Sequence, residues 1–238
     1  MPAPSPLPAA LLDHAARQPD EPWLFYREGW DWRWHSWGEI AGRVVREVER
    51  LASRVPGTRV PVPDIPTPDF VVLDLAVQAA GLVAVPEGEE AGRFVELSQA
   101  GLLAAALRIQ DEIPPPPKPR REVLVAGRSL FDPVDRAIFA WAIVAGAAVL
   151  LEPQPQARAA TAAWARPTVF HGTAEEIAVL RRFAGSGKRW WRRTPGLPFG
   201  RLRVLFLTGN APLPESETTF WRSRGVKLIA PPQGPPFG

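Results

Sequence analysis

Short apolar runs alternate with amphipathic stretches along most of this chain, and this alternation restricts the fold more than any other feature. Strands are expected at 59–63, 82–86, 122–126, 147–151, 168–170, 202–207 and 226–229. Helices are expected at 69–81, 94–107, 134–146, 157–165, 174–184 and 215–224. The strands lack polar alternation, which is typical of strands buried on both faces. The expected fold class is therefore α/β, with parallel sheets covered by helices in two lobes.

A hairpin and a capped helix precede this region. Trp30, Trp32 and Trp34 alternate with polar residues as in a strand, and 22–26 is the expected partner strand, with the turn at 28–29. A packed hairpin and a ligand-stacking platform are both open for this tryptophan row. Ser36 and Glu39 have the spacing of a capping box, and an apolar stripe follows at helical spacing. A helix is therefore expected from Ser36 until Pro56 and Gly57 end it.

Composition excludes several classes of site and partner. The chain has no Cys, so disulfides, Cys-bound zinc and thiol nucleophiles are excluded, and its 3 His are too far apart in sequence to predict a metal site. No apolar run reaches the roughly 18 residues of a membrane span, and the start lacks a signal pattern. We expect a cytoplasmic protein. The net charge of +3 is too small to predict nucleic-acid binding. The 29 prolines and the scarcity of thermolabile residues are typical of thermophile proteins.

The order of the segments resembles the N-terminal portion of the adenylate-forming superfamily, the acyl-CoA synthetases and their relatives. The resemblance starts in "HAARQPDEPWLFYREGWDWRWHSWGEIAGRVVREVERL" and continues through "DFVVLDLAVQAAGLVAVP", "LFDPVDRAIFAWAIVAGAAVLLEP" and "LRVLFLTGNAPLPESETTFWRSRGVKLI". It covers nearly the whole chain but about half of a usual family member. It implies a first lobe over 1–112 and a second over 122–238, joined by a Pro-rich connection at 113–121 in place of the phosphate loop.

Two departures from the family pattern argue against ligase activity. The family binds ATP phosphates with a loop rich in Ser, Thr and Gly, but this chain has four consecutive prolines at 114–117, which offer no N–H donors. The family's later Tyr-Gly-x-Thr-Glu motif has no counterpart in 230–238, and the chain stops before the family's C-terminal domain. We therefore expect no catalytic residues, no cofactor and no metal, and the missing loop argues against ATP or AMP binding.

The resemblance also implies where a residual cleft would lie. It would bind an acyl or adenine-containing ligand at loops after the strands. The implied ligand-binding residues are Asp132, Gly172, Gly209, Asn210, Ala211 and Pro212. A turn residue tolerating positive φ is the alternative interpretation of Asn210.

A basic segment with two tryptophans lies at 188–193. Lys188, Arg189 and Arg192 are candidates for binding a CoA or nucleotide phosphate, and a solvated basic loop is the alternative. The preceding Gly185-Ser186-Gly187-Lys188 is not a Walker loop, because Arg182 and Arg189 stand where Gly and Ser or Thr are needed.

The expected function is that of a truncated acyl-CoA synthetase-like protein without ligase activity. Two alternatives stay open. The chain is an interaction or regulatory subunit for an active synthetase or acyl carrier, or it is a ligase completed in trans by a partner.

Overall fold

The computed structural model describes residues 6–88, 99–113, 121–127, 129, 131–185, 202–209 and 211–229. Its helices are α1 (Pro6–Arg17), α2 (Trp37–Leu51), α3 (Pro68–Ala79), α4 (Gln99–Glu112), α5 (Pro133–Val144), α6 (Pro155–Ala165), α7 (Ala174–Gly185) and α8 (Glu215–Arg222). Its strands are β1 (Pro22–Glu28), β2 (Asp31–Ser36), β3 (Arg59–Val62), β4 (Val83–Pro86), β5 (Val123–Ala126), β6 (Ala148–Leu151), β7 (Val169–Gly172), β8 (Val204–Leu207) and β9 (Lys227–Ile229).

The strands form two sheets. A seven-stranded sheet has the order β2-β1-β6-β5-β7-β8-β9, and β3 pairs with β4 in a two-stranded sheet. Within the described residues every neighbouring pair is parallel except the β1–β2 hairpin, which is antiparallel. The expected α/β class with parallel sheets is confirmed.

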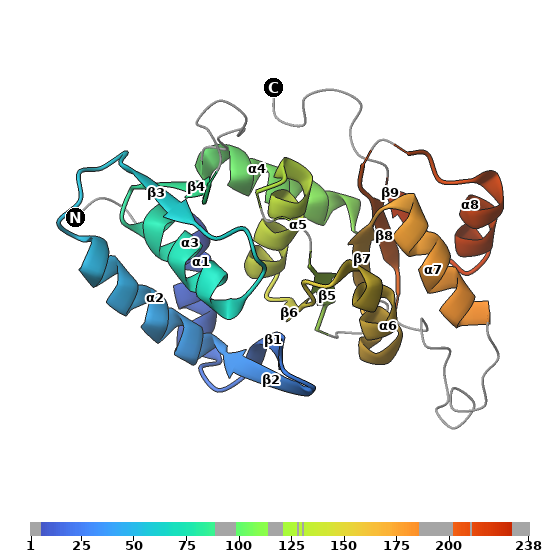
Figure 1. Ribbon diagram of the computed structural model, residues 1–238, viewed down its shortest axis with the longest axis horizontal. Coiled ribbons are helices and arrows are strands. Elements are labelled where there is room, and N and C mark those ends of the chain that lie inside the picture. The colour runs from blue at the N-terminus through green and yellow to red at the C-terminus, as the bar shows by residue number, and fades with distance from the viewer. Residues whose placement is uncertain are drawn as a thin grey trace.

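Helices cover both faces of the larger sheet. Helices α4 and α5 pack against each other on one face, and α6, α7 and α8 lie on the other, as Figure 1 shows. Alternate residues of the buried strands feed two hydrophobic clusters: Val169 and Val204 belong to the one beside α5, whereas Phe170 and Leu205 belong to the one beneath α6 and α7. The first of these clusters continues without a break into α1, α2, α3 and the small sheet.

Most elements begin where local chemistry predicts. The capping box at α2 is confirmed: Glu39 N donates to Ser36 Oγ at 3.1 Å, and Ser36 N donates to Glu39 Oε2 at 2.8 Å. Helix α4 continues past its expected end at Leu107 to Glu112, and its expected start at 94–98 lies outside the described residues. Helix α1 was not expected. It places Leu7 and Leu11 in the core, and its prolines lie in the first turn, where they are tolerated.

The tryptophan row is only partly packed, so the packed-hairpin interpretation applies to only part of it. Trp30 lies in the hairpin turn with 95% of its surface exposed, and Trp34 is 50% exposed. Trp32 is half-buried, with the Arg27 guanidinium carbon 4.9 Å from its ring centroid. The fully buried pair is Trp23 and Trp37, whose rings stack with centroids 4.2 Å apart. The hairpin is therefore anchored at its base and exposed at its tip.

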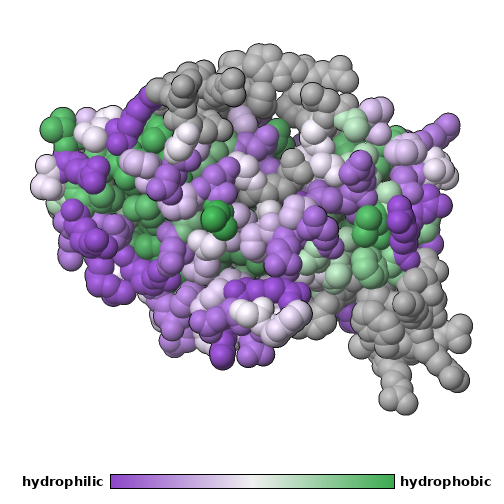
Figure 2. Space-filling model, in the orientation of Figure 1, coloured by the Kyte–Doolittle hydropathy of each residue, from purple (hydrophilic) through white to green (hydrophobic). Residues whose placement is uncertain are grey.

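The proposed division into lobes at 113–121 stays a prediction, because residues 114–120 lie outside the described part of the chain. The β1–β2 hairpin lies in the expected first lobe of the sequence but belongs to the larger sheet, since β1 pairs with β6 from the expected second lobe. Within the described ranges no helix combines the length and hydrophobicity of a membrane span. Figure 2 shows hydrophobic residues in separate groups among hydrophilic ones on the face in view.

Candidate functional site

The chain changes direction across the larger sheet at β5. Helix α5 connects β5 to β6 on one side of it, and helix α6 then connects β6 to β7 on the other side. These two helices cover opposite faces of the sheet. Open α/β sheets bind ligands outside the carboxyl ends of the strands at such a switch point. The carboxyl end of β5, at Gly127, is therefore the place where the fold itself favours a site.

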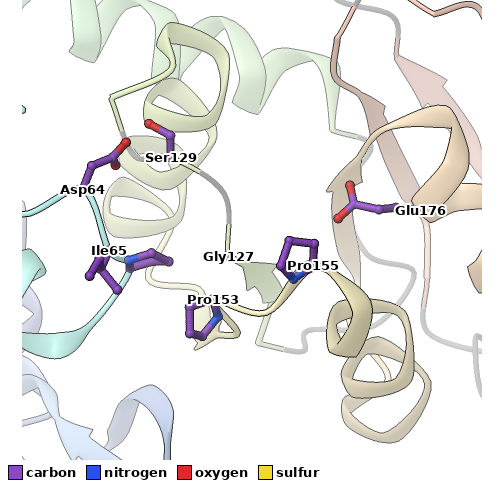
Figure 3. A pocket seen from close by; sticks show the side chains of 8 residues that line it. Asp64, Ile65, Gly127, Ser129, Pro153, Pro155 and Glu176 are labelled. Carbon is purple, nitrogen blue, oxygen red and sulfur yellow. The ribbon is translucent and has the colours of Figure 1, made fainter. Parts of the chain in front are cut away.

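A cleft of about 390 Å³ opens at this point. Its lining residues are Asp64, Ile65, Pro66, Gly127, Ser129, Pro153, Pro155 and Glu176. They come from the loop between β3 and α3, from the ends of β5 and β6, and from the starts of α6 and α7. Figure 3 shows Asp64 and Ser129 on one wall and Glu176 on the opposite one, with Gly127 between them. The cleft thus joins segments that are far apart in the sequence.

Gly127 allows the ends of β5 and β6 to meet at the base of the cleft. Glu152 N donates to Ala126 O at 2.7 Å, which extends the ladder one residue past the strands. A Cβ at position 127 would overlap the carbonyl oxygen of Glu152. Only glycine fits this close approach without moving the backbone.

A buried ion pair supports the far wall. Arg158, on α6, is fully buried and donates to Glu176 Oε1 at 2.6 Å and to the carbonyl oxygen of His171 at 2.6 Å. Glu176 Oε2 accepts the Thr173 backbone N–H at 2.8 Å, and Glu176 N donates to Thr173 Oγ1 at 3.3 Å. Glu176 therefore completes a capping box at α7, while its neighbour Glu175 is exposed.

A second buried carboxylate lies directly behind Pro153. Glu152 has no exposed surface, and its Oε2 accepts from Arg27 Nε at 2.9 Å and from Thr161 Oγ1 at 2.9 Å. Arg27 comes from β1, so this network ties the N-terminal hairpin to the base of the cleft. Its members are fixed by charge-assisted hydrogen bonds rather than left open to a ligand.

A third polar group lies on the α5 face of the same sheet edge. Asp135, in the first turn of α5, is paired with His171 Nδ1 at 2.8 Å, and both side chains are 1% exposed. The next residue, Arg136, donates to the buried Asp74 at 2.6 Å. No sequence motif predicts this pair, since Asp135 and His171 are 36 residues apart. Finding Asp135 from the sequence would have required knowing that the start of α5 packs against the end of β7.

Those residues implied by the family resemblance that the structure describes lie along this edge and are not among the residues that line the cleft. Asp132 is the N-cap of α5, and its Oδ1 accepts from Val134 N at 2.9 Å and Asp135 N at 3.2 Å. Gly172 ends β7, where a Cβ would meet Glu176 Oε2 at 2.9 Å. Gly209 has φ +82° in the turn after β8, and Thr208 N donates to Gly172 O at 2.9 Å.

Ala211 and Pro212, in the loop after β8, are exposed. Asn210, Lys188, Arg189 and Arg192 lie outside the described residues. The roles given to all of these residues stay predictions. Within the described ranges no three His, Asp or Glu side chains are placed to hold a metal ion.

The eight residues that line the cleft carry two carboxylates, Asp64 and Glu176, and none of them is Lys, Arg or His. The described part of the lining therefore supplies no cation to neutralise a bound anion. Its other walls are three prolines, Ile65, a glycine and one hydroxyl, that of Ser129. This lining suits a small, largely uncharged ligand.

Comparisons with known proteins place the fold. No protein-family model matches the sequence, and no curated protein does. A Mycobacterium tuberculosis fatty acyl CoA synthetase is similar with a TM-score of 0.73 and 12% identity, and the match covers 93% of this chain and 58% of that one. The inhibitor-bound N-terminal domain of FACL13 from the same organism has a TM-score of 0.73 and 12% identity, covering 94% of this chain and 74% of that one. The o-succinylbenzoate CoA synthetase from Bacillus subtilis has a TM-score of 0.70 and 13% identity, covering 95% of this chain and 57% of that one.

The chain spans 58% and 57% of the first and third of these proteins. At such low identity the likeness concerns the fold and not the activity. This chain has the fold of the N-terminal portion of the adenylate-forming acyl-CoA synthetases.

Proposed function

We propose that this chain binds an acyl or adenine-containing small molecule in the switch-point cleft and does not adenylate it by itself. One observation carries the proposal: the cleft lies where the fold favours a ligand, yet the lining residues that the structure describes include no cation. The described lining offers a place for the uncharged part of a ligand and no cation for a triphosphate.

The size and lining of the cleft support the binding half of this proposal. Small-molecule sites usually enclose about 300–1,000 Å³ and combine apolar walls with a few polar groups. The cleft has 390 Å³, with Ile65 and three prolines for an acyl chain or a flat ring. The Ser129 hydroxyl and the Asp64 carboxylate supply the polar contacts.

The absence of adenylation is supported by what the chain offers to phosphates. ATP chemistry needs cations and N–H donors around the phosphates. The sequence has four prolines where the family has its phosphate loop, and these provide no N–H. The start of α5 is not available either, because Asp132 already accepts from the amides of Val134 and Asp135.

Calorimetric titrations of the full chain test both halves. The uncharged probes are octanoyl-pantetheine and adenosine, and the charged ones are AMP and Mg-ATP. We expect at least one uncharged probe to bind and Mg-ATP to give no heat. Ile65→Glu should weaken the uncharged probe tenfold or more, because it places a charge in the apolar wall. Val55→Glu is the matched control. Val55 is also an exposed apolar residue, with 72% of its surface exposed against 55% for Ile65, and it is not among the residues that line the cleft.

Three results would contradict the proposal. Binding of Mg-ATP tighter than about 100 μM, roughly −5.5 kcal/mol, would show that the phosphates find a site. ATP–pyrophosphate exchange by the chain alone would show that it adenylates. Equal effects of the two Glu variants would place the ligand elsewhere.

The exposed tip of the β1–β2 hairpin supports a second candidate function, docking to a protein partner. Trp30 is 95% exposed and Trp34 is 50% exposed, next to β2, which is an edge strand of the sheet among the described residues. Large exposed aromatic residues are typical of binding surfaces. An octanoyl-loaded acyl carrier protein should then bind the chain, and Trp30→Ser with Trp34→Ser should abolish that binding. Retention of binding by the double variant would rule out the hairpin as the contact.

A further inference from the structure

Two buried polar atoms at the carboxyl edge of the larger sheet have no hydrogen-bond partner among the described residues. They are Nε2 of His171 and Oγ1 of Thr208. The two residues are 1% and 4% exposed. Leaving a buried donor or acceptor unpaired destabilises a protein, so such groups are nearly always satisfied by something. A partner for either atom would have to come from outside the described residues.

The two side chains lie on the same face of the sheet. His171 is the third residue of β7 and is paired in register with Phe206 of β8, so Thr208 is its diagonal neighbour. Alternation along the strands puts His171, Phe206 and Thr208 on the face of Val169 and Val204, which is the α5 face. Diagonal neighbours in a sheet are within reach of one polar group placed between them.

Asp135 determines what His171 can do. Its carboxylate only accepts, so Nδ1–H of His171 donates to Oδ1 at 2.8 Å. Nε2 of the neutral ring then accepts a hydrogen bond, and Nε2 of the protonated ring donates one. The Thr208 hydroxyl can also donate or accept. A hydroxyl group is therefore the ligand group that matches both atoms in either protonation state of the ring.

The charges around this pair disfavour other ligand groups. A carboxylate or phosphate would lie close to the Asp135 carboxylate, and Arg136 on the same turn is paired with Asp74 at 2.6 Å. A divalent cation needs at least three suitable ligands, and no such group of His, Asp or Glu exists in the described ranges. A neutral hydroxyl meets neither obstacle.

We infer that His171 and Thr208 form a hydroxyl-recognition subsite that selects ligands carrying an alcohol or phenol group. This inference rests on the proposed ligand-binding function, because it adds a specificity element at the sheet edge where the cleft opens. A ligand hydroxyl donates to His171 Nε2 and accepts from Thr208 Oγ1. Asp135 is a positioning residue that fixes the tautomer of the ring. Sites that hydrogen-bond a hydroxyl discriminate strongly against analogues lacking it, because buried polar atoms are then left unpaired.

The first experiment measures the stability of the ligand-free chain by urea unfolding. Thr208→Val removes a hydroxyl without a partner and should leave the unfolding constant unchanged or lower it. Thr161→Val is the matched control: Thr161 is also buried, at 2%, but donates to Glu152 Oε2 at 2.9 Å. It should raise the unfolding constant about tenfold or more. Equal losses of stability in both variants would show that Thr208 has an internal partner, and would overturn the inference.

The second experiment detects the ligand at the histidine ring. The chain has 3 His, so ¹⁵N-histidine labelling gives a simple spectrum, and the loss of one set of signals in His171→Gln assigns that ring. Phenol should shift the Nε2 resonance of His171, whereas fluorobenzene, which has no O–H, should not. Thr208→Val should weaken phenol binding tenfold or more, while Thr161→Val should leave it unchanged.

Failure of this inference is distinguishable from failure of the proposed function. If octanoyl-pantetheine or adenosine binds and responds to Ile65→Glu, the cleft function stands. If phenol and fluorobenzene then behave alike at His171, or if Thr208→Val has no effect on phenol, the hydroxyl subsite is wrong and the two atoms are satisfied by water alone.

Discussion

Arg158 and Glu176 form an ion pair of 2.6 Å directly behind the wall of the cleft, and the arginine has no exposed side-chain surface at all. The same guanidinium donates to the carbonyl oxygen of His171, so one side chain connects α6, α7 and the end of β7. Because the charge cannot reach water, its partner is structurally obligatory. The shape of the cleft wall therefore depends on this pair, which connects the energetics of the fold to the site.

Glu176→Gln should destabilise the chain by about 3 kcal/mol, because it removes the carboxylate charge that the buried Arg158 guanidinium contacts at 2.6 Å. The matched control is Glu175→Gln, which changes the exposed neighbour on the same helical turn and should shift stability by no more than about 0.5 kcal/mol. The measurement is the free energy of unfolding in urea for both variants. Indistinguishable values would show that the pair contributes nothing to stability.

Gly127→Ala should destabilise the fold by about 3 kcal/mol, since its Cβ would overlap the Glu152 carbonyl and push β5 from β6. Gly42→Ala is the control at a glycine within α2, where a Cβ would meet only the end of Arg46 at 3.6 Å. That variant should stabilise the chain by about 0.5–1 kcal/mol, as alanine favours the helix. Gly127→Ala should therefore lower the Tm of thermal unfolding, and Gly42→Ala should raise it. A normal Tm for Gly127→Ala would show that β5 and β6 can separate freely.

Local signals predicted the elements well and the site poorly. The alternation of apolar strands and amphipathic helices depends on neighbours in sequence, so the strand sites and the Ser36–Glu39 capping box could be read directly. The same Thr-x-x-Glu spacing exists at Thr173 and Glu176, at the start of α7. The cleft depends on segments more than a hundred residues apart, such as the loop at Asp64 and the helix start at Glu176, and no local pattern brings these together.

The tryptophans show the same limit. A period of two correctly predicted β2, but it does not say whether the sheet face beneath it is covered by a helix. Trp30 and Trp34 extend beyond the covered part, whereas Trp23 and Trp37 lie where α1 and α2 close over the hairpin base. Which tryptophan is buried is thus decided by tertiary packing and not by the strand pattern.

Trp37→Ala should cost about 3–5 kcal/mol, because it removes a fully buried ring that stacks on Trp23 at 4.2 Å and on His14 at 4.6 Å. Trp30→Ala should change stability by less than about 0.5 kcal/mol, since the ring is almost fully exposed. Both can be measured by denaturant unfolding with a circular dichroism readout, which does not depend on the number of tryptophans. A large loss for Trp30→Ala would mean that the hairpin tip packs on the body.

The stability of the chain should fall as the pH drops below about 6.5, and His14 should account for part of that fall. Burial lowers the pKa of His14 from its ordinary value of 6.5, against the opposing effect of the Val144 carbonyl, and nearby Arg17 lowers it further. In the unfolded chain His14 therefore takes up a proton at a higher pH than in the folded chain. Below pH 6.5 protonation favours the unfolded state, until the folded ring is protonated as well.

His14→Phe isolates this contribution, because phenylalanine keeps a ring against Trp37 and cannot titrate in this range. The free energy of unfolding should be measured from about pH 7.5 to pH 5.5, above the range in which ordinary carboxylates titrate. We expect the difference in free energy of unfolding between the two proteins to change with pH. As the pH falls, the original chain should lose stability relative to the variant. Parallel curves for the two proteins would show that the His14 ring is solvated in the folded chain, contrary to its contacts with Trp37 and Val144.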